Sequence, residues 1–198
     1  MTLKQPLILA SASPRRREIL ALAQIPFVVC PADTEWAPAD LPPEQRVKAL
    51  ARSKAEAVAP WHPDSLVLGA DTMVVLDGQT MGKPHSTAEA TDMLLSLQGR
   101  DHLVLTGVWV IRTDREGNSV KACGFTDEAR VKFFPITREQ AEKYVSTGEP
   151  MDKAGAYAIQ GLGTQFVEGI CGDFYNVMGL PGGRLVRFLQ EFAPDLCE

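Results

Sequence analysis

Residues 7–20 constrain the fold most, because an apolar run ends there in a serine-rich turn and gives way to the start of a helix. The run covers residues 7–10, and Ser11, Ala12, Ser13 and Pro14 follow it. Proline suits the first position of a helix, and serine suits the N-cap position before it. The sequence therefore predicts a strand, a tight turn and a helix that begins at Pro14, with Ser13 as its N-cap.

The first turn of this predicted helix carries three arginines, Arg15, Arg16 and Arg17. A helix N-terminus has a partial positive charge and unpaired N–H groups, so each cation there costs roughly a few tenths of a kcal/mol. A bound anion would reverse the sign of that effect. Two interpretations stay open: a solvated arginine cluster, or a phosphate or polyanion site. The serines, the strand and the proline beside the arginines favour the second.

The charge of the whole chain limits the partners of such a site. The 198 residues carry a net charge of −5, with 45% hydrophobic residues, which is ordinary for a soluble globular protein. Residues 1–32, in contrast, hold four basic residues and one acidic residue. A basic pocket in an acidic protein fits a small charged ligand better than nucleic acid. An aromatic content of 7% also leaves few rings for stacking RNA bases, which disfavours a single-stranded RNA binder.

Cysteine spacing and hydropathy indicate the compartment. The four cysteines are widely spaced and form no C-x-x-C pair, which is typical of free thiols in a reducing compartment. The first residues do not follow the signal-peptide pattern, and no segment approaches the roughly 18 apolar residues of a membrane span. We therefore expect a cytoplasmic protein with no membrane partner.

Strand and helix patterns alternate along the chain. Helices are predicted for residues 14–23, 43–59, 87–98, 138–146 and 180–192. Strands are predicted for residues 7–10, 27–30, 66–76, 103–112 and 120–134, with a hairpin turn at Asp77-Gly78. Residues 148–163 form a glycine-rich loop, and long loops are often functional. The pattern indicates one α/β unit, a single domain over residues 1–198.

Two charged residues interrupt apolar patterns. Lys54 falls inside the apolar stripe of the helix predicted for residues 43–59, where it either reaches solvent at the edge of the core or points at a ligand. Asp71 interrupts the strand predicted for residues 66–76, and an unpaired buried carboxylate is very costly. Asp71 is either a structural cap at a strand break or a metal ligand or general base. Gly69 and Ala70 are expected to leave space for a ligand beside it.

The remaining polar residues and the missing motifs narrow the chemistry. Lys83, after the hairpin, could bring a second ammonium group to the site, whereas Glu35 is uninformative by itself. The three histidines have no metal-ligand spacing and are expected at the surface. The sequence has no P-loop, no G-x-G-x-x-G after a strand, no G-x-S-x-G and no H-E-x-x-H. An arginine and lysine set with a carboxylate remains, which suits metal-assisted phosphate chemistry.

Five features resemble the Maf, or septum-formation-type, nucleotide pyrophosphatases. They are, in chain order, LASASPRR at residues 9–16, Lys54 on its helix, GADT at residues 69–72, GKP at residues 82–84 and DKAGAYAIQG at residues 152–161. The resemblance runs through most of the chain. It implies a mixed α/β fold with an elongated, twisted sheet, flanking helices and two lobes around a central cleft, similar to the inosine-triphosphate pyrophosphatases.

The resemblance also implies an activity and roles for single residues. The loop at residues 152–161 looks like that of the subgroup that hydrolyses dTTP and UTP to the monophosphate and pyrophosphate with Mg²⁺ or Mn²⁺. Asp71 would be the general base, and Glu35 would help it hold the metal. Lys54 and Lys83 would be catalytic residues beside Asp71, and they would hold the phosphates together with Arg15 and Arg16. The other substrate-binding residues would be Ser11 and Ser13 at the helix start, with Arg15, Thr72 and Gln160 in substrate choice. Arg17 is assigned no role.

Three points stay open beside the resemblance. The alternative to an enzyme is a non-catalytic nucleotide-sensing or division-inhibiting module, which would use the same basic pocket without a carboxylate facing the α-phosphate. Relatives also suggest a homodimer. Modified pyrimidine nucleotides are possible substrates beside dTTP and UTP.

Overall fold

The computed structural model describes residues 3–34 and 36–197, in which the strands form one mixed sheet. The strand order is β2-β1-β3-β5-β6-β7, and β4 pairs with β3. The strands are β1 Leu7–Leu9, β2 Phe27–Val29, β3 Leu66–Leu76, β4 Gln79–Met81, β5 Asp101–Thr113, β6 Ser119–Phe133 and β7 Val167–Cys171. The α-helices are α1 Pro14–Leu22, α2 Pro43–Val58, α3 Thr87–Leu97, α4 Arg138–Val145, α5 Phe174–Met178 and α6 Gly182–Phe192.

The chain divides into two compact units. Unit 1 comprises Met1–Asp71, Thr106–Asp127 and Gly179–Glu198, and unit 2 comprises Thr72–Leu105 and Glu128–Met178. Strands β3, β5 and β6 each contribute residues to both units. No helix in the described part of the chain has the length and apolar character to cross a membrane.

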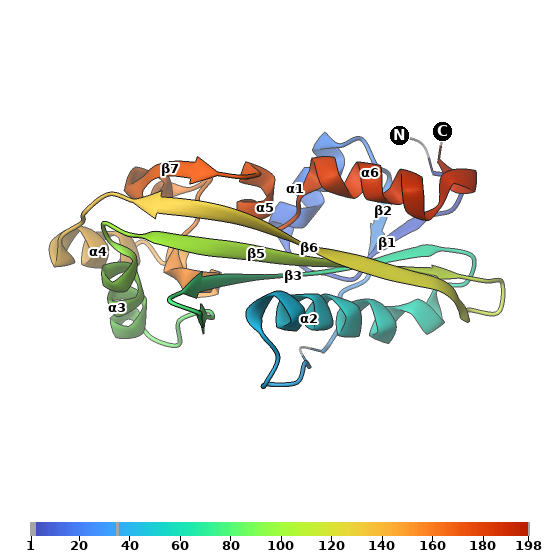
Figure 1. The fold of residues 1–198 in the computed structure, drawn as a ribbon, viewed down its shortest axis with the longest axis horizontal. Helices are drawn as coiled ribbons and strands as arrows, with labels where there is room; N and C mark the ends of the chain where they lie inside the picture. Colours follow the sequence, from blue (N-terminus) through green and yellow to red (C-terminus); the bar gives the residue numbers. More distant parts are fainter. Residues whose placement is uncertain (1–2, 35, 198) are drawn as a thin grey trace. The chain divides into compact units, whose positions relative to one another are not determined.

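Unit 1 is built on three parallel strands. β1 lies between β2 and β3, with Leu9 opposite Val29 on one side and opposite Leu68 on the other. Helix α2 covers one face of these strands, and α1 and α6 lie on the other (Figure 1). All three residues of β1 are therefore buried, which explains why the run is continuously apolar rather than alternating.

Unit 2 contains a hairpin, two helices and an irregular loop. Asp77 and Gly78 both have positive φ angles, 52° and 78°, as the predicted two-residue turn between β3 and β4 requires. α3 packs against α4. The loop predicted for residues 148–163 contains two short 3₁₀ turns, Glu149–Asp152 and Ala154–Ala156, and a third, Leu162–Phe166, begins at its end. Within the loop, the ring of Tyr157 packs edge to face against His102 and Phe133, which also contact each other edge to face.

The structure departs from the predicted elements at β7, α5 and α6, and from one prediction about burial. β7 and α5 were not predicted, because each has only five residues and β7 is mostly exposed, so neither carries a clear hydrophobic period. α6 begins at Gly182 rather than at residue 180, after the N-cap Pro181. The prediction that all three histidines are surface residues is wrong for His102, which is 2% exposed within the aromatic cluster.

Candidate functional site

The turn between β1 and α1 is held by its own polar groups. The predicted N-cap Ser13 occupies that position, but its side chain makes no capping hydrogen bond. The hydroxyl of Ser11 instead accepts hydrogen bonds from the Ser13 N–H, at 3.3 Å, and from Nη1 of Arg16, at 2.9 Å. The first turn of α1 contains no acidic residue. The N-cap side chain therefore does not supply the hydrogen bond that usually satisfies an N–H group at a helix start.

The three arginines of α1 differ in their surroundings. Arg16 is only 8% exposed, and its Nε donates to the carbonyl of Gly179 at 2.9 Å, beside its bond to Ser11. Arg15 is half-buried and Arg17 is exposed. The three arginines therefore do not form a uniform cluster, and the anion site at Arg15 stays a prediction. Arg16 joins α1, the β1–α1 turn and the segment before α6, and Arg17 is the solvated member.

An ion pair joins α2 to β3. Nζ of Lys54 lies 2.5 Å from Oδ1 of Asp71, and the two side chains are 10% and 17% exposed. Lys54 therefore neither extends into solvent nor stands alone in the apolar stripe. The neighbouring ammonium group offsets part of the cost of withdrawing the Asp71 carboxylate from water.

Gly69 determines how closely α2 approaches β3. A Cβ atom at this position would lie 2.0 Å from the carbonyl oxygen of Ala51 and 3.0 Å from Cβ of Ala55. The prediction that Gly69 and Ala70 leave space for a ligand is wrong, because the backbone of α2 fills the space at Gly69 and Ala70 is fully buried. The glycine instead brings Lys54, on the same helix, within reach of Asp71.

Ser11 and Asp71 both lie beyond the end of the parallel β1–β3 ladder. The last residue pair of that ladder is Leu9 with Leu68, and the Ala10 N–H donates to the Leu68 carbonyl. The chain leaves β1 for β2 on one side, and β3 returns on the other side of β1. Ligands of open α/β sheets bind at the carboxyl ends of strands where the strand order reverses in this way. The β1–α1 turn and the Lys54–Asp71 pair occupy that place in unit 1.

Unit 2 brings two other predicted motifs together. The Gly155 N–H donates to the carbonyl of Gly82 at 3.1 Å, so the loop that carries Gln160 is joined to the turn that carries Lys83. Lys83 and Gln160 are both exposed. A Cβ atom at Gly155 would lie 2.9 Å from Val74, and φ there is 67°, so the loop needs glycine to reach this position. Thr72 directly follows Asp71 in β3 and is half-buried.

Of the two predicted metal ligands, Asp71 belongs to the described residues. Glu35 lies outside the described residues, so its predicted role remains a prediction. Among residues 3–34 and 36–197, no three His, Cys, Asp or Glu side chains are grouped so that they could hold a metal ion. Mg²⁺ is often held by one or two carboxylates together with water and substrate phosphates. The largely buried carboxylate of Asp71 fits that mode of binding.

Sequence patterns missed the residues that hold the Gln160 loop. Glu149 and Tyr144 bond to its backbone, as described below, and neither stood out from its neighbours by spacing or charge. The sequence signal for this contact was the pair of glycines at positions 161 and 163. A glycine indicates that another group lies close to the backbone, but it does not identify that group.

Comparison with known proteins gives a family model and sequence relatives that each cover nearly the whole chain. The family model described as Maf-like protein matches residues 6–192. A dTTP/UTP pyrophosphatase of Bacillus velezensis is 48% identical over 187 residues, covering 94% of this chain and 96% of the relative. A protein of the same name from Symbiobacterium thermophilum is 50% identical over 190 residues, covering 96% and 95%.

Two solved structures share the fold at low sequence identity. The Ham1 protein of Staphylococcus aureus has a TM-score of 0.50 at 12% identity, and a HAM1 protein of Coxiella burnetii has 0.51 at 15%. Each alignment covers 94% of this chain and 99% of the other. The predicted mixed α/β fold with flanking helices is confirmed by the sheet and by these neighbours. With the family model matching nearly its whole length, this chain belongs to the Maf-like proteins.

Proposed function

We propose that this protein is a nucleoside triphosphate pyrophosphatase that hydrolyses dTTP and UTP to the nucleoside monophosphate and pyrophosphate. The observation that carries the proposal is 48–50% identity, over nearly the whole chain, to relatives named dTTP/UTP pyrophosphatase. The Lys54–Asp71 pair supplies the carboxylate that such an enzyme needs and that a nucleotide-sensing module would not need. The non-catalytic alternative has no comparable support.

In this proposal Asp71 acts as the general base. A water molecule attacks the α-phosphorus, its proton passes to the Asp71 carboxylate, and the bond from the α-phosphorus to the bridging oxygen breaks so that pyrophosphate leaves. Lys54 holds one oxygen of that carboxylate at 2.5 Å, which fixes the orientation of the base. A base fixed before the reaction avoids reorganisation during it.

The basic residues would bind the phosphates. Arg15 and Lys83, which are less buried than Arg16, are proposed to contact phosphate oxygens and to offset the charge that develops on the leaving pyrophosphate. Arg16 is held by Ser11 and Gly179, and we propose that it keeps the β1–α1 turn in a conformation that presents Ser11 and Ser13 to the phosphates. Arg15, Thr72 and Gln160 are the proposed substrate-selecting residues.

A divalent cation, Mg²⁺ or Mn²⁺, is proposed as the cofactor, with Asp71 and Glu35 as its protein ligands. Such an ion lowers the pKa of a bound water and neutralises charge on the phosphates. The Asp71 carboxylate fits this assignment because oxygen ligands of this kind suit both ions.

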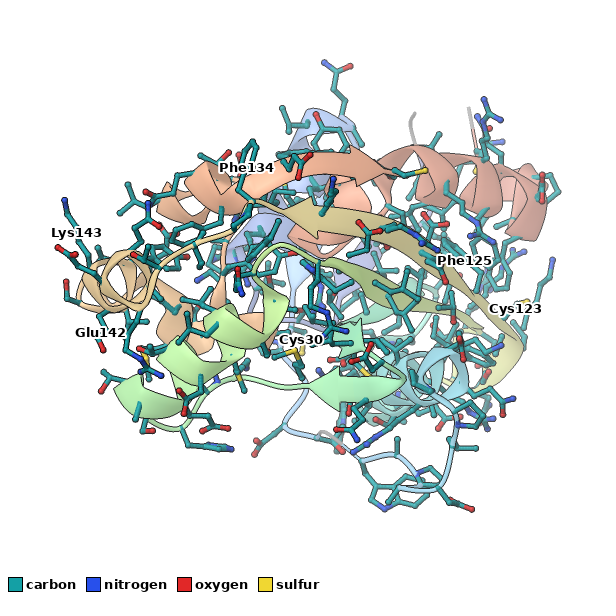
Figure 2. The ribbon with its side chains drawn as sticks, turned by 60° about the vertical axis from the view of Figure 1, so that its left-hand side comes forward. Cys30, Cys123, Phe125, Phe134, Glu142 and Lys143 are labelled. Atoms are coloured by element: carbon teal, nitrogen blue, oxygen red, sulfur yellow. The ribbon has the colours of Figure 1, made fainter. Side chains whose placement is uncertain are left out.

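The proposal also covers the compartment and the oligomeric state of the protein. The cysteines Cys30, Cys123, Cys171 and Cys197 are free in the structure, which supports a reducing compartment such as the cytoplasm. Cys123 lies on β6, as Figure 2 shows. We also propose a homodimer, which size-exclusion chromatography with light scattering would test.

The test of the proposed function is product analysis with a panel of nucleotides. The purified protein with Mg²⁺ is given dTTP, UTP, CTP, ATP, GTP and 7-methyl-GTP, together with modified pyrimidine triphosphates. We expect dTTP and UTP to be hydrolysed fastest, with equal amounts of monophosphate and pyrophosphate. Release of orthophosphate would contradict cleavage at the α-phosphorus. Tight nucleotide binding without any product would favour the sensing module.

A further inference from the structure

We propose that Tyr144 and Glu149 are positioning residues that hold the segment 158–163 in place, and that they thereby fix the orientation in which Gln160 meets the pyrimidine base. The inference rests on the proposed function, because it needs Gln160 to read a base. It assigns substrate discrimination to two residues that have no expected contact with the nucleotide.

The carboxylate of Glu149 binds the C-terminal side of the segment. Its Oε2 accepts a hydrogen bond from the Leu162 N–H at 3.0 Å, and its Oε1 accepts one from the Gly163 N–H at 3.2 Å. The hydroxyl of Tyr144 donates to the same Oε1 at 2.7 Å. One carboxylate thus satisfies two successive backbone donors and one hydroxyl.

The hydroxyl of Tyr144 also binds the N-terminal side of the segment. It accepts a hydrogen bond from the Ala158 N–H at 3.1 Å. Tyr144 is buried on α4, and its ring packs edge to face against Phe166 at 5.1 Å between centroids. Its neighbours Glu142 and Lys143 extend from the outer side of the helix (Figure 2). Because the ring is packed, the hydroxyl is a fixed point for both Ala158 and Glu149.

Gln160 lies between the backbone N–H groups that Tyr144 and Glu149 bind. Ala158 lies two residues before it, and Leu162 and Gly163 follow it at two and three residues, while the Gly161 N–H closes a turn onto the Ala158 carbonyl at 3.2 Å. The backbone on both sides of Gln160 is therefore fixed, and its side chain is exposed. An amide can discriminate between bases only if its donor and acceptor are held within a fraction of an ångström.

The two glycines of the segment show how close the fit is. A Cβ atom at Gly161 would lie 2.5 Å from Oε2 of Glu149, and one at Gly163 would lie 2.9 Å from the Tyr144 hydroxyl. Neither position tolerates a side chain without moving the carboxylate or the ring.

The ionisation states of Tyr144 and Glu149 suit their positioning role at neutral pH. Burial raises the pKa of Glu149, but the hydrogen bonds from Leu162, Tyr144 and Gly163 outweigh it, so the net pKa is lowered. Burial, followed by the hydrogen bond to Glu149, raises the pKa of the Tyr144 hydroxyl. At neutral pH the carboxylate only accepts hydrogen bonds and the hydroxyl keeps its proton, which is the arrangement that the distances require.

The test compares UTP with CTP in Tyr144→Phe and Glu149→Gln. Each variant keeps the shape of its residue and removes a hydroxyl or a charge. We expect the ratio of kcat/KM for UTP to that for CTP to fall about 3- to 10-fold, the size of one hydrogen bond, while kcat for UTP changes little. Glu168→Gln is the matched control, since Glu168 pairs with Lys132 at an exposed site of the same unit. That variant should leave the ratio unchanged.

A double-mutant cycle separates positioning from general stability. In a Gln160→Ala background, Glu149→Gln should lower the ratio no further, because the group that it positions is gone. Hydrogen exchange on the nucleotide-free protein should show faster exchange at Leu162 and Gly163 in Glu149→Gln. An unchanged UTP/CTP ratio in both single variants, or additive effects in the cycle, would overturn the proposal.

The outcomes distinguish this inference from the proposed function. If the wild-type protein released no pyrophosphate from UTP, the proposed function would fail and base positioning would fail with it. If the wild type is active and Gln160→Ala lowers the ratio but Tyr144→Phe and Glu149→Gln do not, only the positioning inference is overturned.

Discussion

Lys54 and Asp71 show how two charged residues that interrupt apolar patterns can be accommodated by pairing with each other. Each charge taken alone interrupts an apolar pattern, and each had a structural and a functional interpretation. Paired at 2.5 Å, each supplies the opposite charge that the other requires. The pairing itself suits either interpretation, because a buried ion pair can hold a helix on a strand or orient a general base. A substitution that keeps the shape and removes the charge distinguishes them.

We predict that Asp71→Asn lowers kcat for UTP by roughly 10²- to 10⁴-fold, the usual contribution of a general base. Binding of a non-hydrolysable UTP analogue, measured by calorimetry, should be retained because the phosphate-binding cations are untouched. The matched control is Asp77→Asn, since Asp77 pairs with Arg100 at an exposed turn and asparagine tolerates its positive φ angle. Full activity in Asp71→Asn would remove Asp71 from the role of base.

We predict that His102 makes the stability of the protein sensitive to mild acid. Burial lowers its pKa from 6.5 to about 4, so the folded state resists a proton that the unfolded chain binds. Stability should therefore fall as the pH drops from 6.5 towards 4, by about 1.4 kcal/mol per pH unit. The loss is complete once the pH is below the folded pKa.

Chemical denaturation at pH 7, 6 and 5 checks this prediction. His102→Gln should flatten the dependence of the unfolding free energy over this range, because glutamine does not titrate. His85→Gln, at an exposed site, should leave the dependence as it is in the wild type. An equal slope in His102→Gln and the wild type would assign the acid sensitivity to other groups.

At the scale of elements, the regular pattern predicted most of the helices and strands to within a few residues. The bounds predicted for β3 are those observed, and α1 and α2 each end one residue earlier than expected. Long elements with an apolar face carry enough residues to show their period. β7 and α5 do not, since tertiary contacts rather than their own pattern stabilise such short segments.

The close approach of α2 to β3 depends on the absence of a side chain at Gly69. We predict that Gly69→Ala destabilises the protein by about 1–3 kcal/mol or more, because the new Cβ would overlap the Ala51 carbonyl unless α2 moves away. Moving α2 would also lengthen the Lys54–Asp71 contact, so activity should fall with stability. Thermal unfolding and pyrophosphate release measure the two effects.

Gly169→Ala is the control for that substitution. Gly169 lies in the strand β7, and a Cβ atom there would meet no other atom within 4 Å. This variant should be as stable as the wild type within about 0.5 kcal/mol, or slightly more stable. Equal stability of Gly69→Ala and Gly169→Ala would contradict the close packing of α2 on β3.

At the scale of the whole molecule, an acidic protein is proposed to bind a highly charged anion. The net charge of −5 repels a nucleoside triphosphate at long range, so binding depends on the local cations and on neutralisation of the phosphates by a metal ion. The match to the Maf-like proteins also extends over nearly the whole molecule, because it covers residues 6–192 rather than a single motif.

We predict that a chelator abolishes pyrophosphate release and that Mg²⁺ or Mn²⁺ restores it. Residual activity of more than about 1% in metal-free buffer would argue that the basic residues alone suffice. Calcium, which is larger and less demanding in geometry, should bind and restore less activity. The thermal midpoint of the nucleotide-free protein should change little on chelation, because no three described metal-ligating side chains are grouped.

The sequence by itself determined the α/β class, most element bounds and the family, and it supplied the candidate residues of the site, because periodicity, turn chemistry and motif order are local properties of the chain. Only the tertiary structure decided which residues meet. It paired Lys54 with Asp71, tied Arg16 to Ser11 and Gly179, buried His102, and placed Tyr144 and Glu149 under the Gln160 loop. A hydrogen bond between residues far apart in the chain depends on how helices and strands pack, and no local pattern records that packing. The arginines of α1 illustrate both contributions. The sequence placed them at the helix start, and tertiary packing buried Arg16 and left Arg17 exposed to solvent.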